Sequence, residues 1–180
     1  MKKDLLALAA VVLILVFVFS GTKIQSVDEY YLTHIDDIRE DSETVFLTIR
    51  CDTVFDHPED LDPALREGNY LPEDGMILAR TEYVLRAGDT VYDILDRAVR
   101  YHKIQMECVY SANYASVYVQ GIAHLYEFGC GELSGWMYTV NGKFPNFGCS
   151  KYTLSDGDEI VWCYTCDLGR DVGCDWQVDA

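Results

Sequence analysis

The residues of this sequence best suited to chemistry are its cysteines, of which there are seven in 180 residues. Thiols form disulfides in oxidising compartments, and as thiolates they bind zinc or act as redox nucleophiles. Cys163 and Cys166 form a C-x-x-C motif, which Cys174 follows. In an exported chain, seven cysteines indicate disulfides with one thiol left over, whereas the motif also raises redox and zinc chemistry.

The C-x-x-C motif lies in a segment, Glu159 to Cys166, whose composition predicts a strand. Side chains alternate along a strand, so Cys163 and Cys166 face opposite ways and converge only if the strand ends between them. The residues that follow do not resemble the helix N-terminus that lowers the pKa of a redox thiol. Disulfides are therefore favoured over redox catalysis and over a zinc site that includes Cys174.

No other pattern indicates catalysis or metal binding. The four histidines lie singly, without paired spacing or a Gly-x-Ser-x-Gly motif, at His34, His57, His102 and His124. The acidic stretch 52–74 matches no EF-hand spacing, so a solvated loop is favoured over a calcium site. We therefore expect no catalytic residue, no metal site and no enzymatic activity.

The best candidates for binding are aromatic residues near Asn141 and Gly142. An Asn-Gly pair readily adopts the positive φ values of a type I′ turn, so a hairpin is predicted with strands at 136–140 and 143–145. Binding surfaces favour aromatic side chains. The candidate ligand-binding residues are Trp136, Tyr138, Phe144, Asn146 and Phe147. Trp136 and Tyr138 share one strand face and could instead fill the core, whereas the phenylalanines lie nearer the hairpin tip.

Several further elements are predicted to position these residues. The stretch 89–103 predicts an amphipathic helix, because its apolar residues recur at helical spacing and Asp89 or Thr90 can cap its start. Strands are predicted at 44–51, 76–86, 104–110, 116–122 and 159–166, with the acidic loop 52–74 carrying a short helical turn at 63–67. With 49% hydrophobic and 13% aromatic residues, the chain has enough apolar surface for a globular domain.

The N-terminal segment resembles a targeting signal. Lys2 and Lys3 precede an uncharged apolar run, Leu5 to Phe19, whose length lies between a signal peptide and a spanning helix. An uncleaved signal anchor is favoured, which predicts residues 1–22 as the anchor and an extracytoplasmic domain; if the segment is cleaved, the protein is secreted. Residues 23–43 are predicted to form an acidic stalk, and residues 44–180 the folded domain.

The charge of the chain bears on its partners. The formal net charge is -16 at pH 7, and no cluster of lysine or arginine appears. Nucleic acids bind through such clusters, so a nucleic-acid partner is excluded. The remaining partners are a small-molecule ligand or a protein of the cell envelope, with the membrane contacted through the N-terminal segment.

The C-terminal run Cys130 to Gly169 resembles the transcobalamin-like C-terminal domain of unknown function found in bacterial surface proteins. That family is related to the β domain of the vitamin B12 carriers transcobalamin and intrinsic factor. The residues that carry the resemblance are Trp136, Tyr138, Asn141, Gly142, Pro145, Gly148, Tyr152, Gly157, Asp158 and Trp162. The strand at 44–51 and the helix that begins near Gly88 extend the resemblance towards the N-terminus.

The resemblance implies an α+β fold, in which a β-grasp-like mixed sheet packs on one helix after the N-terminal segment. In such a fold Cys51 and Cys166 would lie on neighbouring first and last strands, so they form one expected disulfide. The other, Cys130 with Cys149, would bracket the hairpin. The function implied is a binding module for a small ligand, such as a corrinoid, held with a partner domain. A cell-envelope interaction or scaffold module without a ligand is the alternative, and no cofactor other than cobalamin is implied.

Overall fold

The computed structural model describes residues 12, 26, 30, 34–68 and 70–175. The predicted anchor, residues 1–22, lies almost entirely outside the described residues, as does the first half of the predicted stalk. Among the helices of the described part, none is long and apolar enough to cross a membrane.

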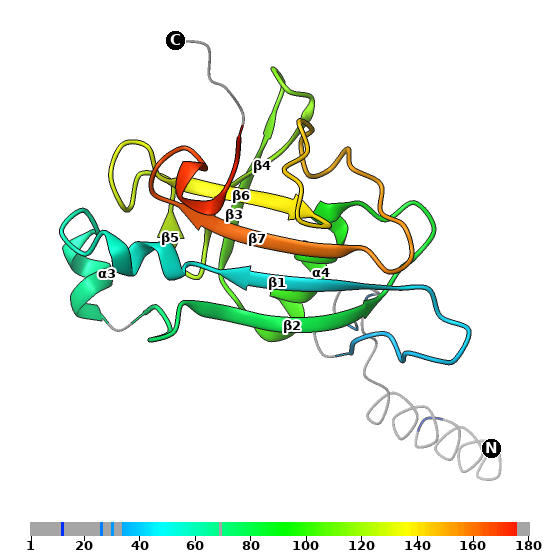
Figure 1. The fold of residues 1–180 in the computed structure, drawn as a ribbon. Coiled ribbons are helices and arrows are strands. Elements are labelled where there is room, and N and C mark those ends of the chain that lie inside the picture. Colours follow the sequence, from blue (N-terminus) through cyan, green and yellow to red (C-terminus); the bar gives the residue numbers. More distant parts are fainter. Residues whose placement is uncertain (1–11, 13–25, 27–29, 31–33, 69, 176–180) are drawn as a thin grey trace.

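The fold is built on a four-stranded mixed sheet in the order β2-β1-β7-β6. Its strands are β1 (Thr44–Arg50), β2 (Met76–Val84), β6 (Gly135–Val140) and β7 (Glu159–Thr165). β1 runs parallel to β7, while the β1–β2 and β6–β7 pairs are antiparallel (Figure 1). The first and last strands are therefore central neighbours, which confirms the predicted β-grasp-like mixed sheet.

The longest helix among the described residues, α4 (Val91–His102), lies across one face of this sheet (Figure 1). Thr90 caps it: the Thr90 side chain accepts a hydrogen bond from the Asp93 backbone, and Asp93 returns one to the Thr90 backbone. The five apolar residues predicted to face the core, Val91, Ile94, Leu95, Ala98 and Val99, are all buried. They pack into one core with the alternate residues Val45, Leu47 and Ile49 of β1.

A second, three-stranded sheet has the order β3-β4-β5. The two strands predicted at 104–110 and 116–122 form an antiparallel hairpin of β3 (Met106–Ser111) and β4 (Ser116–Ile122), and β5 (Leu125–Tyr126) adds a short edge strand. Ile122 and Leu125 are buried in the common core. The loops carry the short helices η1 (Asp52–Asp56), α3 (Pro63–Gly68) and η2 (Arg170–Val172).

The predicted hairpin at 136–145 is wrong in its second strand. The Asn-Gly turn is present, with φ values of 53° at Asn141 and 73° at Gly142. Lys143, however, makes only an isolated bridge with Val140, and β6 pairs along its whole length with β7. Residues 144–149 therefore follow the turn as a loop, and β6 remains an edge strand whose one neighbour in the described sheet is β7.

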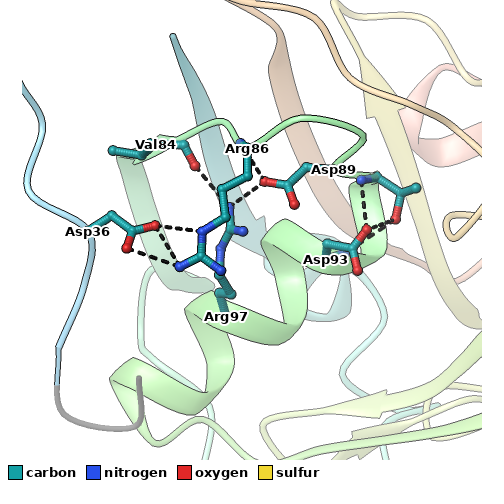
Figure 2. A network of polar contacts seen from close by, with 7 residues as sticks. Asp36, Val84, Arg86, Asp89, Asp93 and Arg97 are labelled. Atoms are coloured by element: carbon teal, nitrogen blue, oxygen red, sulfur yellow. Dashed lines mark hydrogen bonds and ion pairs between the residues drawn. The ribbon is translucent and has the colours of Figure 1, made fainter. Parts of the chain in front are cut away.

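Part of the predicted acidic stalk contacts the domain. The carboxylate of Asp36 pairs with the guanidinium of Arg86, at 2.7 Å. Beside it, Arg97 of α4 donates to the carboxylate of Asp89 and to the carbonyl oxygen of Val84, so two arginines and two aspartates meet at the end of β2 (Figure 2). The ion pair of Asp36 with Arg86 thus holds this part of the chain against the domain.

Candidate functional site: an aromatic groove

The described residues form a groove of about 480 Å³, within the range of small-molecule binding sites. We call it the aromatic groove. It lies where the β3–β4 hairpin, strands β6 and β7, and the loop after the Asn-Gly turn meet. Its lining residues are Ser111, Tyr114, Ser116, Val117, Tyr118, Val119, Trp136, Met137, Tyr138, Pro145, Asn146, Phe147, Gly148, Cys149 and Trp162.

Four of the five candidate binding residues line this groove. Trp136 and Tyr138 come from β6, and Asn146 and Phe147 come from the loop that follows the turn. The fifth, Phe144, is half-buried and is not part of the lining. Residues 144–149 form a loop where the second strand of the hairpin was predicted. This loop places Asn146 and Phe147 in the same groove as Trp136 and Tyr138 of β6.

Phe147 is the most open aromatic residue of the loop, with 64% of its surface exposed. Its carbonyl oxygen accepts a hydrogen bond of 2.7 Å from the Tyr138 hydroxyl. Burial raises the pKa of Tyr138 above its ordinary value, with smaller contributions from Cys149 and Tyr152. Tyr138 therefore remains a protonated donor at neutral pH and ties the loop to the sheet.

Trp162 is one of the lining residues that sequence reasoning did not assign to the site. It lies opposite Tyr138 in the β6–β7 register, and the two ring centroids are 5.4 Å apart. The side chain is buried, yet its indole N–H has no hydrogen-bond acceptor among the described residues. A buried donor without a partner costs about 1 to 3 kcal/mol, so such a group calls for an explanation.

Trp136 shows the usual arrangement for comparison. Its indole N–H donates to the carbonyl oxygen of Leu125 at 2.8 Å, and its ring packs edge-on against Tyr164. Both tryptophans were visible in the sequence as strand residues. Only the three-dimensional structure shows that one N–H is satisfied and the other is not.

No residue of the groove lining carries a formal charge. Tyr118 at its edge donates a hydrogen bond to Glu127, and burial together with this carboxylate raises the pKa of Tyr118 to about 12. The groove is thus neutral in a chain of net charge -16, so an anionic ligand would meet no compensating cation in the lining.

All seven cysteines are free thiols in the structure, so neither expected disulfide is present. In the β1–β7 ladder Arg50 is level with Cys163, so β1 ends before it reaches the level of Cys166. Cys51 is therefore not opposite Cys166. The thiol of Cys166 instead makes a hydrogen bond with that of Cys130, the residue expected to bond Cys149.

One group of potential metal ligands occurs among the described residues. The ligand atoms of His57, Glu59 and Asp60 lie within 4.8 Å of one another. Glu59 and Asp60 are exposed. Carboxylates of this kind are common on solvated loops, and no further feature of the described chain marks the group as a site.

Residues 88–166 match the family described as a domain of unknown function (DUF4430). Haptocorrin in complex with Cbi is similar in structure, with a TM-score of 0.47 and 11% identity, over 74% of this chain but 27% of haptocorrin. A protein from Ruminococcus gnavus ATCC 29149, provisionally named as metal-binding, aligns with a TM-score of 0.41 and 11% identity, over 68% of this chain and 96% of its own. No curated protein sequence matches this chain.

Proposed function

We propose that this protein is a binding module that holds an uncharged, planar small molecule in the aromatic groove. The observation that carries the proposal is Trp162, a residue of the groove lining whose buried indole N–H lacks an acceptor among the described residues. A ligand with a carbonyl or ring nitrogen would supply that acceptor. Its flat faces would stack on the neighbouring rings, which favour offset and edge contacts.

The remaining features of the groove narrow the class of ligand. The neutral lining disfavours charged molecules, while the amide of Asn146 offers both a donor and an acceptor at the rim. The volume suits a molecule of a few fused rings rather than a macrocycle. Phe147, mostly exposed in the free protein, would lose that exposure when a ligand enters.

The first experiment titrates the protein with Nile red, a neutral planar dye that carries a carbonyl acceptor, and follows its fluorescence. Saturable binding is expected, and Phe147→Ala should weaken it about tenfold or more, because a hot-spot aromatic contributes about 2 kcal/mol. Phe144→Ala is the matched control: it removes the same side chain outside the groove and should bind as the parent does. Equal affinities for the two variants would contradict the proposal.

The sequence resemblance suggests a different form of the proposal, in which the groove contacts one part of a corrinoid, a macrocycle too large for the groove alone, and a partner domain holds the rest. A ligand of that size needs two facing walls, and the groove supplies one. The isolated domain should therefore bind cobinamide or cobalamin weakly in an absorbance titration. A sub-micromolar dissociation constant without a partner would contradict this form of the proposal.

Interaction with an envelope protein is a second candidate, favoured by the exposed aromatic side chains of the second sheet. Tyr110, Tyr114, Tyr118 and Val109 are all at least 41% exposed on the β3–β4 hairpin. Both candidate functions assume that an N-terminal anchor places the domain outside the cytoplasm. A membrane-impermeant thiol reagent applied to intact cells after mild reduction should label the protein; labelling only after lysis would contradict this location.

A further inference from the structure

We propose that six of the seven cysteines form three disulfides and that the seventh remains a buried thiol. The bridges join Cys108 to Cys149, Cys130 to Cys166, and Cys163 to Cys174, and they leave Cys51 free. This connectivity differs from the pairs that the sequence suggested. It follows from which thiols the fold places side by side, and it holds whether or not the groove binds a ligand.

The bridge between Cys130 and Cys166 links the turn before β6 to the end of β7. The thiols of Cys130 and Cys166 hydrogen bond to each other. The Cys130 thiol also lies 3.6 Å from the carbonyl oxygen of His57, and the side chain of Thr53 contacts Cys166. Cys130 and Cys166 therefore share one pocket between the η1 loop and β7.

The bridge between Cys108 and Cys149 links β3 to the loop that forms one wall of the groove. Tyr92 of α4 contacts both members: its hydroxyl lies 3.5 Å from the Cys108 thiol, and its N–H donates to the Cys149 carbonyl oxygen. The Cys149 thiol lies 3.3 Å from the carbonyl oxygen of Val117, on the strand that pairs with β3. Burial raises the pKa of Cys149 to about 12, and the nearby Cys108 adds to this rise.

The third pair holds the C-terminal turn against the sheet. Met137 lies opposite Cys163 in the β6–β7 register, and its carbonyl oxygen is 3.8 Å from the Cys163 thiol. Cys174 reaches the same place: a Cβ built on Gly169 would lie 2.7 Å from Cβ of Cys174 and 2.8 Å from Sδ of Met137. Burial raises the pKa of Cys163 to about 12, and Cys174 is among the smaller contributors.

The two members of the C-x-x-C motif lie beside different cysteines. Cys163 is in β7, which ends at Thr165, and Cys166 directly follows the strand. Cys163 lies near Cys174, whereas Cys166 lies near Cys130. The motif thus supplies one cysteine to each of two bridges.

Cys51 is the thiol left over. It is fully buried at the end of β1. Burial is the main cause that raises its pKa to about 12, and the carboxylates of Asp52 and Asp74 add to the rise. Among the described residues, no other cysteine contributes to this rise in the pKa of Cys51. A neutral buried thiol of this kind is inert in the folded protein.

The reaction balances with a disulfide oxidant such as oxidised glutathione. One cysteine thiolate attacks the glutathione disulfide and releases one glutathione, and the second cysteine then displaces the other glutathione from the mixed disulfide. The formation of each bridge thus removes two protons and two electrons from the protein, and these reduce the glutathione disulfide to two thiols. Because five of the seven thiols are buried in the folded chain, oxidation should occur during folding.

The experiment refolds the reduced chain, residues 1–180, from urea in a glutathione redox buffer, with a detergent present to keep the apolar N-terminus soluble. Free thiols are then alkylated under denaturing conditions, and the bridges are identified by non-reducing peptide mapping. The expected result is one alkylated residue, Cys51, and the three proposed bridges. A link between Cys130 and Cys149, a link between Cys51 and Cys166, or three or more free thiols would overturn the proposal.

Two variants extend the test. Cys51→Ser should form the same three bridges and contain no free thiol. Cys166→Ser should leave two free thiols, Cys51 and Cys130, while the other two bridges form as before. If Cys166→Ser fails to fold, replacing Cys130 and Cys166 together by serine removes the bridge without an orphan thiol; the mapping must then show the other two bridges, and any rearranged link contradicts the assignment.

Discussion

The rings of Tyr138 and Trp162 lie with their centroids 5.4 Å apart and their planes inclined by 34°. They are cross-strand partners, so the antiparallel register of β6 and β7 fixes their contact. The Tyr138 hydroxyl is bonded to the loop, whereas the Trp162 N–H has no acceptor among the described residues. Both rings line the groove, but only the polar group of Tyr138 has a hydrogen-bond partner among the described residues.

Tyr138→Phe tests how the loop is held. The change removes the hydrogen bond to the Phe147 carbonyl oxygen while keeping the ring, so it should lower the free energy of unfolding by about 1 kcal/mol. Nile red affinity should fall as the loop loosens. Tyr110→Phe, on an exposed ring outside the groove, is the control and should alter neither quantity. Unchanged dye binding by Tyr138→Phe would argue against a positioning role.

The two tryptophans should respond differently to the same substitution. Trp136→Phe breaks a formed hydrogen bond and leaves the Leu125 carbonyl oxygen unpaired, while Trp162→Phe removes a donor that has no partner among the described residues. Trp136→Phe should therefore lower the free energy of unfolding by about 1 to 3 kcal/mol more than Trp162→Phe, as measured in urea. Equal losses, or the reverse order, would mean that the Trp162 N–H is satisfied in solution.

The sequence predicted most of the sheet and helix because periodicity and caps report local environment. Thr90 as N-cap and the buried face of α4 are such cases. It could not predict the partner of β6, since the residues at 143–145 look as suitable for a strand as β7 does until the whole sheet is assembled. Trp162 was missed for a similar reason: an unpaired N–H depends on every neighbouring acceptor, which no local pattern records.

The cysteines show the same division between local and tertiary information. Strand alternation argued against contact between Cys163 and Cys166 provided that the strand continued to Cys166, but β7 ends at Thr165. The choice of partners depended on where the η1 loop and the C-terminal turn come to lie, and these are irregular segments. Cys130 with Cys149 was a natural expectation only for a two-stranded hairpin that does not form.

The charge network at the end of β2 gives a stability prediction (Figure 2). Asp89 accepts hydrogen bonds from Arg97 and from the Arg86 N–H, and both side chains of the Arg97 pair are largely buried. Asp89→Ala should therefore cost about 3 kcal/mol in urea unfolding, because it leaves a buried cation unpaired. Asp36→Ala removes the more exposed partner of Arg86 and should cost less than about 1 kcal/mol. Similar losses for both would contradict this ranking.

Alkaline pH should destabilise the fold through Cys51 and Tyr83. Burial raises the pKa of Cys51 from 9.0 to about 12 and that of Tyr83 from 10.0 to about 12. Since the unfolded chain releases these protons first, stability is complete below pH 9 and is lost as the pH rises from about 9 to 12. The urea midpoint should thus fall across this window, and Cys51→Ser should fall less between pH 9 and 10. Parallel curves for the parent and Cys51→Ser would contradict the burial of this thiol.

The indole N–H signals of the protein test the central claim most directly. With the tryptophans labelled with 15N and assigned by single substitution to Phe, the spectrum is recorded while coumarin, a soluble neutral planar carbonyl compound, is added. The Trp162 signal should shift progressively and saturate as its N–H gains an acceptor, while the Trp136 signal, already bonded to Leu125, should move little. Naphthalene-2-sulfonate, planar but anionic, should move neither. A Trp162 signal that stays in place while coumarin saturates the protein elsewhere, or that does not respond to coumarin at all, would contradict the assignment of the groove as the binding site.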